Sequence, residues 1–97
     1  MENIEIIKAK LLEQKPLLSE RFNVKEIGIF GSFVRGEQSE ASDIDILVEF
    51  SKPIGFFTFI DLEDYLSEIL DTKVDLVSKK ALKPHIGKNI LSELVTV

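Results

Sequence analysis

The chain has 97 residues and a formal charge of −5 at neutral pH, with an isoelectric point of about 4.8. This acidic balance argues against general nucleic-acid binding, because phosphate contacts need a basic surface. The length predicts a single domain over residues 1–97, and the absence of cysteine excludes a disulfide scaffold and a thiolate zinc site. No segment resembles a signal peptide or a membrane span, so we expect a cytoplasmic protein without membrane contact.

A helix and a strand are predicted first along the chain. Apolar residues recur at helical spacing over residues 3–21, and Asn3 is placed to act as the N-cap. Pro16 is expected to kink or divide this helix. Residues 24–30 alternate in the manner of a strand.

A tight turn at Gly31 and Ser32 is predicted next. One short helical turn follows and ends at Gly36, a residue suited to the left-handed position after a helix. A polar loop then leads to a second strand at residues 44–50.

The second half of the chain continues with alternating helices and strands. An amphipathic helix is predicted at residues 56–70, and a third strand at residues 72–78. Pro84 is expected to open a last helix, and residues 94–97 to form a short edge strand. The order predicts an α/β (α+β) protein in which helices flank a mixed β-sheet.

Carboxylates lie within the most apolar strands. Asp43 and Asp45 are two residues apart, so on a strand they project from one face, about 6–7 Å apart at the backbone. Asp75 interrupts the third strand and points away from its apolar neighbours. If the two strands are neighbours, three carboxylates meet, and a hard cation such as Mg²⁺ relieves their repulsion. Taken singly, each aspartate is better explained as a loop cap or a surface residue, but the three together favour a metal site.

The turn before these aspartates fits a phosphate. Gly31 lets the backbone approach closely, and the Ser32 hydroxyl adds a donor beside the amides that open the short helix. Arg35 either contacts phosphate or pairs with an acidic side chain to brace the loop. Ser42 is suited to fix the loop through hydrogen bonds from its side chain to the backbone.

These motifs together resemble the nucleotidyltransferase superfamily of the DNA polymerase β type. The segments that carry the resemblance are "GSFVRGEQSEASDID", "VEF", "KVDLVS" and "ALKPHI", which extend over nearly the whole chain. Within the superfamily the chain is similar to the minimal nucleotidyltransferases (MNT). The resemblance implies a fold like the palm of DNA polymerase β.

The resemblance also implies roles for the residues. Gly31 and Ser32 correspond to residues that hold the triphosphate of ATP or another nucleoside triphosphate, and Arg35 and Ser42 lie in the same nucleotide-binding segment. Asp43, Asp45 and Asp75 correspond to a catalytic triad that coordinates two Mg²⁺ ions. The implied reaction is an in-line attack of a hydroxyl on the α-phosphorus, with pyrophosphate leaving.

Similar MNT proteins are antitoxins encoded beside helical HEPN ribonuclease toxins, and they transfer AMP from ATP to a tyrosine of the toxin. Two other hypotheses remain open at this point. The chain is alternatively a binding module that neutralises its partner without catalysis, or a nucleotidyltransferase of the aminoglycoside-modifying sort that acts with a separate helical subunit. Substitution of Asp43 separates the first alternative from an enzyme, and labelled ATP with candidate acceptors separates the second.

One aromatic cluster has two explanations. Phe56, Phe57 and Phe59 are more aromatic side chains than one helix face can bury. They belong either to the core or to an interface with a partner.

Overall fold

The computed structural model describes residues 3–36, 43–82 and 84–97. The helices and strands follow the order α1 (Ile4–Phe22), β1 (Val24–Phe30), α2 (Ser32–Arg35), β2 (Ile44–Phe50), α3 (Phe56–Leu70), β3 (Val74–Ser78), the 3₁₀ helix η1 (Lys79–Ala81), α4 (Pro84–Glu93) and β4 (Val95–Thr96). No helix in these ranges is both long enough and apolar enough to cross a membrane.

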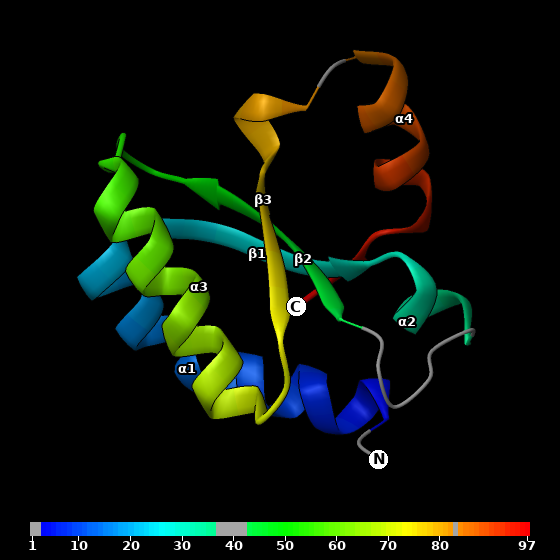
Figure 1. Cartoon of the computed structure of the whole chain (residues 1–97), viewed down its shortest axis with the longest axis horizontal. Coiled ribbons are helices and arrows are strands. Elements are labelled where there is room, and N and C mark those ends of the chain that lie inside the picture. Colours follow the sequence, from blue (N-terminus) through cyan, green and yellow to red (C-terminus); the bar gives the residue numbers. More distant parts are fainter. Residues whose placement is uncertain (1–2, 37–42, 83) are drawn as a thin grey trace.

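The strands form one four-stranded sheet in the order β3-β2-β1-β4. β2 is antiparallel to β1 and parallel to β3, and the short edge strand β4 is antiparallel to β1. The parallel pair is connected by α3, since parallel neighbours need a crossover (Figure 1). The predicted mixed sheet with flanking helices is confirmed.

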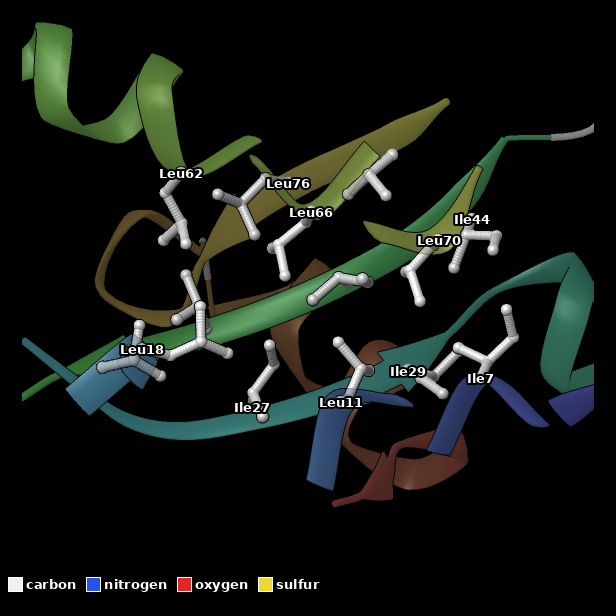
Figure 2. Packing of buried hydrophobic residues seen from close by; sticks show 14 of the residues in the cluster. Ile7, Leu11, Leu18, Ile27, Ile29, Ile44, Leu62, Leu66, Leu70 and Leu76 are labelled. Carbon is white, nitrogen blue, oxygen red and sulfur yellow. The ribbon is translucent and has the colours of Figure 1, made fainter. Parts of the chain in front are cut away.

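The hydrophobic core lies between this sheet and the helices α1 and α3. Ile44, Ile46 and Val48 of β2 are at most 1% exposed, as period-two alternation predicts. Figure 2 shows buried side chains of both helices converging on the strands. The helical residues that are fully buried or nearly so are Ile7, Leu11, Leu18, Leu62, Leu66 and Leu70. One apolar face of β2 therefore anchors the strand that carries Asp45.

Helix α1 begins as predicted, because the Asn3 side chain accepts a hydrogen bond of 3.0 Å from the Ile6 amide. The helix is continuous from Ile4 to Phe22, so the expectation that Pro16 divides it is wrong. Pro16 is exposed, and Leu12, whose carbonyl loses its helical donor, is 60% exposed. Water can therefore replace the missing hydrogen bond.

The opposite face of the sheet receives the C-terminal segment. A Cβ atom on Gly28 would lie 2.7 Å from Leu94 Cδ1, so the absent side chain makes room for that leucine. The Val97 amide donates to the Ile27 carbonyl at 2.9 Å, and Lys15 Nζ donates to the Val97 carbonyl at 3.0 Å. This segment is thereby fixed against β1.

Core packing by α3 can be tested with Leu66→Ala, because Leu66 is 0% exposed. Removing its buried side chain leaves a cavity and is expected to lower the free energy of unfolding by about 2–5 kcal/mol. Urea denaturation followed by circular dichroism measures the change. Leu12→Ala, which truncates an exposed leucine, is the matched control and should change stability little. Equal losses in both variants would contradict this description of the core.

Candidate active site

Asp45 lies in the middle of the sheet, near the start of β2. The register pairs it with Phe30 of β1 on one side and with Asp75 of β3 on the other. Paired residues on neighbouring strands project from the same face, and neighbouring strands are about 4.8 Å apart. The second and third strands are neighbours, which was the condition for these aspartates to meet, so Asp45 and Asp75 lie side by side.

Asp43 lies just before β2, two residues from Asp45. The Ile44 amide donates to the Lys73 carbonyl at 3.0 Å, which ties the start of β2 to the start of β3. The Lys73 ammonium also lies 3.9 Å from Asp43 Oδ2, in an exposed ion pair. Lys73 is a cation at the site that the sequence analysis did not single out.

The carboxylates influence one another electrostatically. Burial raises the pKa of Asp45 above its usual value, and the negative charges of Asp75 and Asp43 raise this pKa further. Arg35 acts in the opposite direction, and Glu93 adds to the increase. Asp45 is therefore a carboxylate whose ionisation is opposed by its own neighbours.

The three aspartates do not form a preassembled metal site among the residues that the structure describes. Within residues 3–36, 43–82 and 84–97, no three His, Cys, Asp or Glu side chains form a group that could hold a metal ion. The donor set still fits a hard cation, because it consists of carboxylate oxygens whose crowding raises the pKa of Asp45.

The predicted turn at Gly31 lies directly against Asp45. Gly31 has φ +81° and ψ −155°, a backbone conformation almost exclusive to glycine. A Cβ atom at this position would collide with Asp45 Oδ2. The turn and the aspartate are thus in contact, although 13 residues separate Gly31 from Asp45 in the sequence.

The helical turn after Gly31 follows the prediction. α2 begins at the half-buried Ser32, and Gly36 ends it in the left-handed conformation with φ +74°. The Gly36 amide donates to the Ser32 carbonyl. Ser42 lies outside the described residues.

Glu93, at the end of α4, connects the parts of this turn. Its Oε1 accepts a 3.0 Å hydrogen bond from the Gly31 amide, and both of its oxygens accept from Arg35 Nη1, at 3.1 and 3.0 Å. Of the two predictions for Arg35, the structure shows the pairing with an acidic side chain. Sequence reasoning missed Glu93, since it lies 62 residues from Gly31. The only signal was its position directly before the predicted C-terminal strand.

Comparison with known proteins assigns this arrangement to a family. Residues 11–97 match the family described as "Nucleotidyltransferase domain". The chain belongs to this family of nucleotidyltransferases. The resemblance read from the glycine–serine turn and the aspartates is confirmed.

Relatives of this nucleotidyltransferase include protein adenylyltransferases and minimal nucleotidyltransferases. It is 50% identical to Protein adenylyltransferase MntA of Thermococcus cleftensis, over 100% of this chain and 98% of that protein. A solved structure provisionally named a minimal nucleotidyltransferase has a TM-score of 0.84 and 28% identity, over 99% and 97% of the two chains. A toxin–antitoxin crystal structure with AMP-PNP has a TM-score of 0.75 and 26% identity, over 91% of this chain and 69% of that one.

The contact between the turn and Asp45 predicts unequal effects of two glycine substitutions. Gly36→Ala places a side chain in the left-handed region, which costs roughly 1–2 kcal/mol. Gly31→Ala places one in a region almost exclusive to glycine, which costs roughly 1–3 kcal/mol. Only Gly31→Ala adds a collision, because nothing lies within 4 Å of a Cβ atom at Gly36. We expect Gly31→Ala to lower the unfolding midpoint in urea more than Gly36→Ala does.

A double-mutant cycle isolates the collision itself. In an Asp45→Ala background the carboxylate is absent, so Gly31→Ala should cost less than in the wild-type nucleotidyltransferase. The same cost in both backgrounds would show that backbone strain alone makes glycine necessary.

The raised pKa of Asp45 also predicts how the stability of the protein depends on pH. Its pKa is raised in the folded protein above the value of 3.8 that serves as the reference for the unfolded chain, so the folded protein binds this proton more tightly. The destabilisation by Asp45 is therefore absent below pH 3.8, and it develops as the pH rises through the folded pKa. Asp45→Asn should raise the melting temperature at pH 7, with a gain that vanishes at low pH.

Thermal unfolding followed between pH 3 and pH 8 would measure this dependence. Asp64→Asn, which removes an exposed carboxylate of α3, is the matched control. A gain from Asp45→Asn that is the same at every pH would contradict an origin in the ionisation of Asp45.

Proposed function

We propose that this nucleotidyltransferase transfers AMP from ATP to a tyrosine of a partner HEPN-type ribonuclease toxin and so inactivates the toxin. The observation that carries the proposal is the placement of Asp45 beside Asp75, with the Gly31 turn against Asp45. The 50% identity to a protein adenylyltransferase supports a protein as the acceptor. The related toxin–antitoxin structure with AMP-PNP supports ATP as the donor. Residues 1–97 would act as a single domain in the cytoplasm, where ATP is available.

We assign metal binding to Asp43, Asp45 and Asp75. Their carboxylate oxygens suit Mg²⁺, and a bound cation would remove the repulsion that raises the pKa of Asp45. When bound, Mg²⁺ neutralises charge on the triphosphate and on the departing pyrophosphate, and two ions are expected with the nucleotide. Metal binding by Asp43 would break its ion pair with Lys73. The free-energy cost is small, because the pair is exposed and its charged atoms are 3.9 Å apart.

The chain's own residues position the nucleotide and accept a proton. Gly31 and Ser32 hold the triphosphate at the turn, and Ser42 belongs to the same binding segment. Asp75 accepts the proton of the attacking tyrosine hydroxyl. The tyrosine oxygen then forms a bond to the α-phosphorus, while the bond from this phosphorus to the oxygen of the β-phosphate breaks and pyrophosphate leaves.

Glu93 modifies the proposal for Gly31 and Arg35. The Gly31 amide and the Arg35 guanidinium both donate to the Glu93 carboxylate, which occupies a position suited to a phosphate oxygen. Arg35 braces the turn through Nη1, and exchange of Glu93 for a phosphate would free this nitrogen for the nucleotide. The main role of Gly31 is to leave room for the Asp45 carboxylate, because glycine has no side chain.

Intact-mass spectrometry of the partner toxin provides the test of transfer. The toxin should gain the mass of one or more AMP groups after incubation with the wild-type protein, Mg²⁺ and ATP. Asp45→Asn and Asp75→Asn each remove one carboxylate and should reduce the rate at least about a hundredfold. Asp64→Asn should transfer at the wild-type rate.

The other outcomes of this experiment separate the competing functions. A stable complex without any mass gain, together with neutralisation by Asp45→Asn, would establish a non-catalytic binding module. AMP transfer to small molecules but not to the toxin, measured with labelled ATP, would establish a small-molecule nucleotidyltransferase.

A further inference from the structure

A groove of about 720 Å³ lies at the end of the sheet opposite to the aspartates. It is formed by the end of β2, the loop that follows, the start of α3, and the junction of β3 with η1. Figure 1 shows the start of β2 beside α2 on the right of the view and the start of α3 at the upper left. The apolar and cationic side chains that line the groove include those of Lys52, Ile54, Phe56, Phe59, Lys79 and Lys80.

The groove is separated from the catalytic edge by the length of β2. Asp45 is near the first end of the strand, and Phe50 is its last residue. Five residues of extended strand span about 17 Å. An occupant of the groove therefore leaves Asp45 and Asp75 accessible to the nucleotide.

Aromatic side chains form the apolar part of the groove and its margin. Phe59 packs edge-to-face against Phe50, with ring centroids 6.2 Å apart, and belongs to the periphery of the core. Phe56 and Phe57 are 72% and 79% exposed, and their ring centroids are 5.7 Å apart. Of the three aromatic residues, Phe59 therefore packs against the core, whereas Phe56 and Phe57 expose a large apolar area to water.

Positive charge surrounds these aromatic rings, although the whole chain is acidic. Lys52, Lys79 and Lys80 line the groove, and the only carboxylate in its lining, that of Glu49, lies 4.0 Å from the Lys79 ammonium. The first turn of α3 contains no acidic residue and receives no side-chain cap from Gly55, so the positive end of its dipole adds to the same field. The groove therefore combines apolar rings with an excess of cationic groups.

We propose that this groove, with the exposed ring of Phe57 beside it, docks an acidic segment of the acceptor protein that carries an apolar side chain. The proposal rests on the proposed function, since the acceptor is the protein that receives AMP. Charge complementarity decides the occupant, because carboxylates pair with the lysines while an apolar anchor covers the rings. A second copy of this chain is a poor occupant, since a two-fold contact would place this cationic patch against the same cationic patch of the other copy.

The test compares groove variants with matched controls, using the purified acceptor toxin and isothermal titration calorimetry. Lys52→Glu/Lys80→Glu reverses two exposed charges of the groove, and Phe56→Ser removes an exposed ring. Lys8→Glu/Lys88→Glu changes the net charge equally on α1 and α4, outside the groove. Leu12→Ser is the control for Phe56→Ser. Groove variants should bind the acceptor about tenfold or more weakly, whereas the controls should stay near wild type.

Transfer kinetics distinguish docking from catalysis. The groove variants should raise the KM for the acceptor and leave kcat near the wild-type value, because Asp45 and Asp75 are unchanged. Asp45→Asn should bind the acceptor with wild-type affinity and transfer AMP at least about a hundredfold more slowly. Higher salt should weaken wild-type binding more than binding by Lys52→Glu/Lys80→Glu.

Each outcome decides one of the two proposals. Wild-type binding by both groove variants, together with normal transfer, overturns docking in the groove and leaves the transferase intact. Binding that depends on the groove but yields no transfer supports docking and overturns the proposed activity. A wild-type dimer that Phe56→Ser converts to a monomer in sedimentation would instead assign the groove to a second copy, and absence of both binding and transfer overturns both proposals.

Discussion

The parallel pairing of β2 with β3 is the constraint on which the site depends. This register places Asp45 beside Asp75, and it requires a crossover connection, which α3 provides. The same helix buries Leu62, Leu66 and Leu70 against the sheet. Burial of one face of β2 therefore fixes the carboxylates on the other face, because a shift of one residue would expose the core and bury the charges. Packing and chemistry are two consequences of one register.

The site lowers stability in order to hold these groups together. Asp45 is partly buried beside two carboxylates and a glutamate, and all of these effects raise its pKa. Gly31 adjoins it in a conformation that other residues avoid, with no space for a side chain. Neither feature is explained by the needs of the core, which lies on the opposite face. A backbone conformation reserved for glycine and an opposed ionisation at one place are typical of a functional site.

Local features of the fold were predictable, and long-range ones were less so. The bounds of β1, β2 and α3 follow from alternation and helical spacing, and Gly36 was correctly placed after α2. The sequence analysis predicted Asp45 and Asp75 as partners only if their strands were neighbours, because spacing along the chain does not determine strand order. Glu93 was missed for the same reason, since its contact with Gly31 requires that β4 pair with β1. Division of the helix at Pro16 was wrongly allowed for, because the exposure of this helix face was unknown.

The pairing of β4 with β1 restrains the position of Glu93 and so maintains this long-range contact. β4 pairs with β1 at Gly28 and Ile29, just before the Gly31 turn. Because only Leu94 separates Glu93 from β4, strand pairing limits how far the Glu93 carboxylate can move from the Gly31 amide and from Arg35. A phosphate that takes the place of Glu93 exchanges one anion for another at the same donors, without unfolding the turn. The fold thus holds the turn in place through the Glu93 carboxylate, which accepts from both the Gly31 amide and Arg35.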